Sequence, residues 1–250
     1  MEIINKNSEK HKDDGRQSMI GIIGAMEQEV AGLQNQMTDK KVLKRTSMEF
    51  VEGKIFDKEV VVVKCGVGKV NAGICTQILV DEYKVDFLIN TGAAGSLCKD
   101  IDICDIVIST EALQHDMDSV DFGFELGQVP FLPLCYEADK DLIKLAEECC
   151  KEVNPDIHVY CGRVVSGDEF VAKKERKEWI KSHFQGLCTE MEGAAMAQAA
   201  YLNQVPFVII RAISDKADDS AEMDFPTFSA KASERSIRLI LRMLEKTERK

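Results

Sequence analysis

The sequence predicts an α/β protein with a central β-sheet covered by helices. Short apolar runs rich in Val and Ile end in glycine or polar residues, at 19–24, 60–66, 87–92, 105–110, 162–168 and 206–214. Continuous apolar runs of this length are typical of strands buried on both faces of a sheet. Helical stretches lie between them, and strands that alternate with helices are the pattern of an α/β sheet.

The helices are predicted at roughly 27–37, 69–83, 139–153, 173–183, 191–203 and 227–246. The third (ADKDLIKLAEECCKEV) and the last (SERSIRLILRMLEK) are clearly amphipathic, with one apolar face each. Residues 112–135 form one long excursion, and loops of that length within a compact domain are usually functional. We predict a single domain over 19–250, since no linker or repeat interrupts it.

Residues 1–18 are polar and mixed in charge, without the apolar core of a secretory signal. We predict an N-terminal extension without fixed structure over residues 1–18, and an unusual start-site assignment explains this segment equally well. No apolar run reaches about 18 residues, so no membrane-spanning helix is expected. The net charge of −11 argues against a nucleic-acid partner, because binding a phosphate backbone requires clustered Lys and Arg.

The nine cysteines form no CxxC pair, and several lie inside apolar runs such as VVVKCGVG. This pattern indicates free thiols in a reducing cytoplasm. The four histidines form no HExxH motif, so no metal site is expected. We therefore expect a cytoplasmic protein that needs no cofactor and does not bind a membrane.

Small and acidic residues follow the predicted strands, as GAMEQE (24–29), GVGK (66–69), TGAAG (91–95), DEF (168–170) and RAISD (211–215). Ligands of α/β sheets bind at the carboxyl ends of the strands, so these segments predict a site at one edge. GVGKVN lacks the third glycine of GxGxxG and the Ser or Thr of a P-loop, so it carries no dinucleotide or triphosphate signature.

Several of these residues have a purely structural explanation as well. Glu29 lies in the first turns of a helix, where an acid pairs with the helix dipole. Asp215 is equally well explained as a cap of a helix or turn. Arg211 lies inside the apolar run VIIRAIS, and a buried Arg is rarely unpaired, so we expect it to face Glu29 or Glu192. Glu190 precedes a helix, where an acid is favoured as a cap.

Taken together, GIIGAMEQEV, CGVGKVNAG, NTGAAGSL, VVSGDEFV, TEMEGAAMAQAAY and VPFVIIRAISDKAD form an ordered set that covers essentially the whole domain. In order and spacing they resemble the bacterial 5′-methylthioadenosine/S-adenosylhomocysteine nucleosidases. The resemblance implies a nucleoside phosphorylase-like fold, in which a central mixed β-sheet is partly closed into a barrel and flanked by α-helices. It also implies a homodimer in which the excursion over 112–135 lends Phe122 to the partner's site.

The resemblance implies hydrolysis of the N-glycosidic bond of a nucleoside substrate, with release of adenine. Asp215 matches the general acid at adenine N7, and Glu29 matches the acid that activates the attacking water. Glu192 matches the residue that binds the ribose hydroxyls while Met191 packs on the sugar, and Arg211 would lie beside the carboxylates. Such chemistry requires one carboxyl protonated and another ionised, so their environments must separate their pKa values.

The other substrate-binding positions implied by the resemblance are Met26, Val67, Gly95, Phe170, Val171, Ser214 and Phe225. Phe170 would stack on adenine while the Val171 backbone reads its edge. Met26, Val67 and Phe225 would line the sugar and the 5′-alkylthio group. The family usually has Ser where this chain has Ala93, so a hydroxyl near the ribose is missing.

Three alternatives remain open from the sequence. A purine nucleoside phosphorylase of the same fold would need cationic groups for phosphate, but this chain has Asn90 and an acidic GAMEQE loop there. A nucleosidase for another 5′-substituted adenosine, such as aminodeoxyfutalosine, would carry the same motifs. A non-catalytic nucleoside-binding protein should have lost Glu29 or Asp215, and both are present.

Overall fold

The computed structural model describes residues 18–218 and 220–247, so the extension predicted over 1–18 lies outside it except for Ser18. The strands are β1 (Met19–Gly24), β2 (Thr38–Arg45), β3 (Met48–Ile55), β4 (Lys58–Lys64), β5 (Phe87–Ser96), β6 (Ile106–Gln114), β7 (Tyr136–Glu137), β8 (Val159–Ser166), β9 (Cys188–Glu190) and β10 (Phe207–Asp215). The helices are α1 (Glu27–Gln36), α2 (Lys69–Tyr83), α3 (Lys140–Val153), α4 (Lys174–Phe184), α5 (Gly193–Asn203) and α6 (Ala221–Lys246), with a 3₁₀ turn at Val120–Phe122.

One mixed sheet runs through the molecule in the order β10-β6-β8-β9-β5-β1-β4-β3-β2, with β7 beside β6. Strand β10 pairs with β5 in parallel and with β6 antiparallel, which joins the two ends of the β5–β9–β8–β6 segment. These five strands therefore close into a barrel, while β1, β4, β3 and β2 continue as an open sheet. The predicted mixed sheet, partly closed into a barrel, is confirmed.

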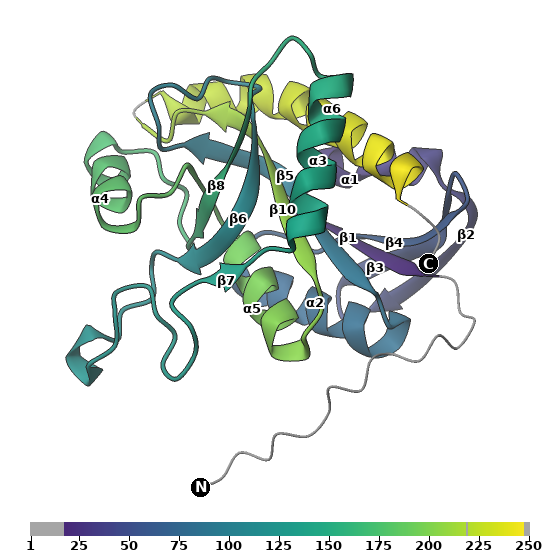
Figure 1. Ribbon diagram of the computed structural model, residues 1–250, viewed down its shortest axis with the longest axis horizontal. Helices are drawn as coiled ribbons and strands as arrows, with labels where there is room; N and C mark the ends of the chain where they lie inside the picture. The colour runs from purple at the N-terminus through teal and green to yellow at the C-terminus, as the bar shows by residue number, and fades with distance from the viewer. Residues whose placement is uncertain (1–17, 219, 248–250) are drawn as a thin grey trace, which may run out of the picture.

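Helices cover both sides of the sheet (Figure 1), with α1, α3 and α6 on one side and α2 and α5 on the other. Each side has its own apolar core: Val30, Leu142 and Leu239 belong to one, and Leu79 and Ala197 to the other. In the described part of the chain, no helix has the length and apolar character needed to cross a membrane.

The structure adds a hairpin that the apolar runs did not predict. Strand β2 is exposed along its whole length, and β3 places Glu49, Glu52 and Lys54 among its buried residues, so neither contains a continuous apolar run. Helix α6 also begins at Ala221, before the predicted start at 227, and contains Pro226. A proline inside a helix removes a backbone hydrogen bond, which is why the sequence predicted a later start.

Candidate active site

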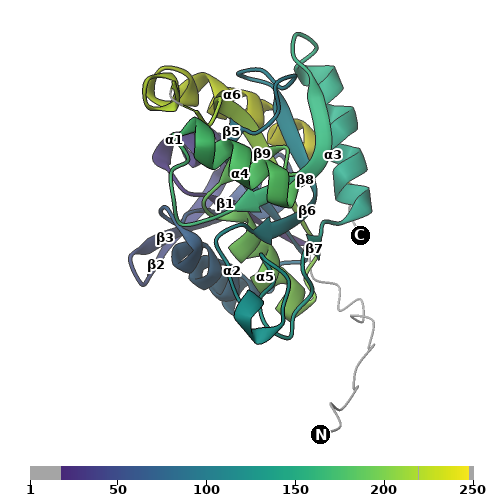
Figure 2. The same cartoon turned by 90° about the vertical axis from the view of Figure 1, so that its left-hand side faces the viewer.

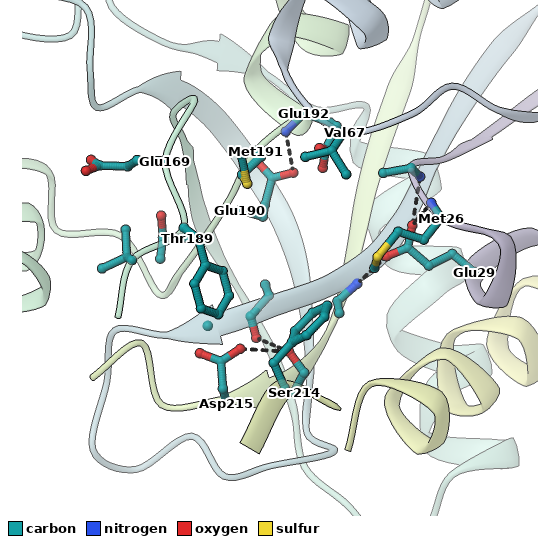
Figure 3. Close-up of a pocket in the computed structure, with 17 residues that line it drawn as sticks. Met26, Glu29, Val67, Glu169, Thr189, Glu190, Met191, Glu192, Ser214 and Asp215 are labelled. Carbon is teal, nitrogen blue, oxygen red and sulfur yellow. Dashed lines mark hydrogen bonds between the residues drawn. The ribbon is translucent and has the colours of Figure 1, made fainter. Parts of the chain in front are cut away.

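A cavity of about 250 Å³ lies where the loops after the central strands meet. Figure 3 shows its lining residues as sticks, contributed by β5, β9, β10, the first turns of α1 and α6, and the loops after β1, β4, β8 and β9. It is lined by Ala25, Met26, Glu29, Val67, Ala93, Ala94, Gly95, Glu169, Phe170, Val171, Thr189, Glu190, Met191, Glu192, Ser214, Asp215 and Phe225. Every site residue named from the sequence lines it, except Arg211 and Phe122.

Asp215 is the last residue of β10 and is buried, and each of its two carboxylate oxygens accepts one hydrogen bond. Oδ1 accepts the backbone N–H of Ala217 at 2.8 Å, and Oδ2 accepts the hydroxyl of Ser214 at 2.9 Å. A Cβ on Gly95 would come within 2.7 Å of Oδ1, so only glycine leaves room for the carboxylate there. Burial raises the pKa of Asp215, and Asp218 and Asp224 raise it further, although the two hydrogen bonds oppose this.

Glu29 folds back from α1 over the end of β1. Its Oε2 accepts the N–H groups of Ala25 and Met26 at 2.7 and 2.9 Å, and its Oε1 accepts that of Ala93 at 3.0 Å. The side chain therefore caps its own helix and also faces the cavity. The structural explanation of Glu29, as an acid at a helix start, is thus compatible with a role in the site. Burial raises the pKa of Glu29, while the Arg211 charge and the backbone donors oppose the rise.

Arg211 lies fully buried behind the cavity wall and pairs with Glu190. Its Nε and Nη2 both donate to Glu190 Oε2, and Nη2 also donates to Asn90 Oδ1. As expected, Arg211 faces Glu192, whose Oε2 lies 3.9 Å from Nη2, but in the described chain the carboxylate that it hydrogen-bonds is Glu190, and Glu29 forms no hydrogen bond with it. The pairing follows from β10 and β9 both flanking β5 in the barrel.

Glu190 is both the predicted cap and the partner of Arg211. Its carboxylate accepts the backbone N–H groups of Glu192 and Gly193 at the start of α5, and the hydroxyl of Ser166. Burial opposes its ionisation, but Arg211 and these donors hold the pKa of Glu190 below its usual value. The site therefore contains one carboxylate that stays ionised and neutralises the buried guanidinium.

Glu192 is the other carboxylate of the TEMEG segment, and it faces the cavity with one strong donor. Its Oε1 accepts the N–H of Gly68 at 2.8 Å. Burial and the negative charge of Glu190 raise the pKa of Glu192 to about 8. Three carboxyls in one cavity thus have raised pKa values, which is the pattern expected where acid and base chemistry are combined.

Glu192→Gln is expected to stabilise the fold at alkaline pH. The folded-state pKa of Glu192 lies above its ordinary value of 4.5, so the wild type loses stability as pH rises toward about 8, and neutral Gln does not. We expect the variant to gain roughly 2 kcal/mol in free energy of unfolding near pH 9 and almost nothing near pH 5, measured by urea denaturation. A gain that is the same at both pH values would contradict this, and Glu82→Gln, at an exposed pair, is the control.

The rest of the cavity wall is mainly apolar and aromatic. The rings of Phe170 and Phe225 meet edge to face, with centroids 5.8 Å apart. Met26, Val67 and Met191 complete this wall. Phe122 is 84% exposed and does not line the cavity of its own chain, so its role toward a partner subunit stays a prediction.

Comparison with known proteins decides the family. Residues 19–245 match the phosphorylase superfamily. A 5′-methylthioadenosine/S-adenosylhomocysteine nucleosidase from an Exiguobacterium species is 41% identical over 230 residues, which are 92% of this chain and 98% of that protein. The chain belongs to this nucleosidase family.

Solved structures agree with this assignment. The Neisseria meningitidis nucleosidase, in complex with methylthio-immucillin-A, has a TM-score of 0.90 and 37% identity, over 92% of this chain and all of that one. A futalosine hydrolase of Helicobacter pylori has a TM-score of 0.88 and 33% identity, over 92% of this chain and 98% of that one. The family's fold is thus shared by enzymes that are named for different nucleosides.

Within this family fold, some lining residues were not named from the sequence. Thr189 and Glu169 line the cavity beside residues that were named, and Ala93 contributes a backbone donor to Glu29. Glu169 stood in the quoted DEF segment, but only the structure shows its neighbours His115 and Arg176. In the described part of the chain, no cluster of three or more His, Cys, Asp or Glu is arranged to hold a metal.

Proposed function

We propose that this protein hydrolyses the N-glycosidic bond of 5′-methylthioadenosine and S-adenosylhomocysteine, releasing adenine and the 5-thio-substituted ribose. The observation that carries the proposal is the pair of buried carboxyls, Asp215 and Glu29, that face one cavity from different elements (Figure 3). Between them the cavity offers aromatic rings for a base and apolar side chains for a thioether.

The reaction needs groups that act on both products of bond cleavage. Asp215, whose pKa is raised by burial, donates a proton to adenine N7 and makes the base a neutral leaving group. Glu29 orients and activates the water that attacks C1′. Positive charge develops on the ribose in the transition state, and the nearby carboxylates stabilise it, as paired acids do in O-glycosidases.

Water is a better nucleophile than phosphate in this cavity. Among the described lining residues none is Lys, Arg or His, while five are Asp or Glu. Arg211 lies beneath them with its charge engaged by Glu190. A phosphate ion would therefore find no free cation in the described lining to bind it, and any ionised carboxylate there would repel it. This argues for hydrolysis over phosphorolysis.

An adenine-release assay tests the proposal. Purified protein should release adenine from methylthioadenosine and adenosylhomocysteine in phosphate-free buffer, and added phosphate should leave the rate unchanged. A rate that depends on phosphate would identify a phosphorylase. Much faster turnover of aminodeoxyfutalosine would assign the other substrate, and tight binding without turnover would identify a binding protein.

We infer that the active unit is a homodimer built on the excursion between β6 and β7. Figure 1 shows this segment reaching away from the body of the molecule. Its Phe122 and Phe131 are 84% and 91% exposed, and Val70 of α2 and Leu202 of α5 are also exposed. Exposed apolar side chains in such number are typical of a protein interface. A second copy would cover them and bring Phe122 to its partner's cavity.

Phe122→Ala is expected to raise KM for methylthioadenosine about 10-fold, because it removes an aromatic wall supplied by the partner. The variant should remain dimeric in sedimentation velocity, since one truncation leaves the rest of the interface. Phe56→Ala is the matched control, because Phe56 is an exposed Phe in the turn between β3 and β4. A monomeric wild type with normal turnover would contradict both the dimer and the role of Phe122.

We also place the protein in the cytoplasm. All nine cysteines are free, and several of them are buried. Burial raises the pKa values of thiols such as Cys75 and Cys188, so these side chains are inert and suit a reducing compartment. Fractionation of cells that produce the protein tests this placement.

A further inference from the structure

The turn that follows Asp215 is held by a lysine from α4. Lys177 Nζ donates to the backbone C=O of Lys216 and lies 3.6 Å from Asp218 Oδ2. Its side chain is only 15% exposed, so the ammonium is removed from most of the solvent. Figure 2 shows α4 facing the viewer, beneath the first turns of α6.

A second lysine holds the same turn from the other side. Lys216 Nζ donates to the backbone C=O of Ile101 at 2.7 Å and to Asp102 Oδ1 at 2.6 Å. The backbone C=O of Lys216 receives Lys177, while its side chain reaches the loop before β6. The turn is thereby fastened to two elements that do not otherwise contact the cavity.

Ala217 lies between Lys216 and Asp218, the two residues that Lys177 contacts, and its N–H connects this turn to Asp215. It is fully buried in one apolar cluster with Ile180 and Phe184 of α4. Its φ of 51° is a left-handed conformation that residues with a side chain rarely adopt, so the surroundings must hold it. The N–H of Ala217, aimed by this conformation, is the donor to Asp215 Oδ1. The orientation of the carboxyl thus depends on the turn.

The same attachment reaches the aromatic wall of the cavity. Asp218 Oδ1 accepts the N–H and the hydroxyl of Ser220 at 3.1 and 2.9 Å, directly before α6. Helix α6 carries Phe225 into the cavity. Asp218 therefore connects the general-acid turn to the start of α6.

We propose that Lys177 and Lys216 are positioning residues for Asp215, and that they hold its carboxyl at the angle needed to protonate the base. The inference rests on the role proposed above for Asp215. Neither lysine lines the cavity, so neither contacts the substrate. Their effect must therefore appear in the rate of proton transfer more than in substrate affinity.

Lys177→Met and Lys216→Met are each expected to lower kcat about 30-fold while KM changes less than about threefold, because small misplacements of a catalytic group reduce rates strongly. Lys177→Arg keeps donors to the C=O and the carboxylate, so it should recover most of kcat. Lys181→Met, an exposed lysine on the same helix, should behave as the wild type. In an Asp215→Asn background, Lys177→Met should cause no further loss.

The results separate this inference from the proposed function. Normal turnover by Asp215→Asn would contradict the assignment of Asp215 as the general acid. An inactive Asp215→Asn beside Lys177→Met and Lys216→Met variants with normal kcat would overturn only the positioning role. A loss from Lys177→Met that persists undiminished in the Asp215→Asn background would also overturn it. Lys177→Arg and Lys216→Met keep the test decisive if Lys177→Met fails to fold, which thermal unfolding would reveal.

Discussion

Asp215→Asn is expected to lower kcat for adenine release about 10³-fold while changing the dissociation constant of the substrate less than about threefold. The amide keeps the shape of the side chain and can still accept the Ser214 hydroxyl or the Ala217 N–H, but it cannot deliver a proton to N7. Single-turnover kinetics and calorimetric titration of methylthioadenosine measure the two quantities. Asp156→Asn, at an exposed pair with Arg235, is the matched control and should keep full activity.

The pH dependence of kcat provides a second readout of the same group. Burial raises the pKa of Asp215, so the carboxyl keeps the proton that adenine needs to a higher pH than an exposed Asp does, and loses it as pH rises through that pKa. The wild-type rate should therefore fall on the alkaline side, and the residual rate of Asp215→Asn should not. The pKa of Glu192 is also raised, to about 8. If Glu192→Gln loses the alkaline decline instead, the decline belongs to Glu192.

Glu190→Gln is expected to destabilise the fold by about 3–5 kcal/mol, because it removes the carboxylate that is hydrogen-bonded to the buried guanidinium of Arg211. Arg211 is fully buried, and Glu190 provides its charge pairing through Nε and Nη2. The amide would also lose strength as an acceptor for the N–H groups of Glu192 and Gly193. Urea denaturation near neutral pH measures the loss.

A matched control tests whether burial is the cause. Glu82→Gln makes the same chemical change, from carboxylate to amide, in the partner of another arginine, Arg45. That ion pair, with 2.9 Å between Arg45 Nε and Glu82 Oε2, is exposed. Exposed pairs contribute less than about 1 kcal/mol, so this variant should unfold close to the wild type. Equal losses in free energy of unfolding from both variants would show that burial does not increase the contribution of the Glu190–Arg211 pair. Because Arg211 lowers the pKa of Glu190, its contribution to stability should be lost at acid pH.

The sequence by itself determined the buried strands, most helices and the acids at the strand ends. Continuous Val and Ile runs identify β1, β4 and β10 because a strand covered on both faces must be apolar throughout. Exposed strands such as β2 leave no such signal, and β9 is only three residues long. The placement of Glu29 and Asp215 at one cavity followed from strand direction, since parallel strands bring their carboxyl ends together.

Only the tertiary structure decided how the charges of the site are paired. Glu190 and Glu192 are two residues apart and chemically identical, yet Arg211 binds the first, and the second faces the cavity with a raised pKa. Which of them meets Arg211 depends on the pairing of β9 with β5 and β8 in the closed barrel, a contact between distant parts of the chain. The same holds for the lysines beside Asp215. Their role arises because α4 packs on the turn after Asp215, which is distant from it in sequence. Local sequence patterns do not predict such a contact.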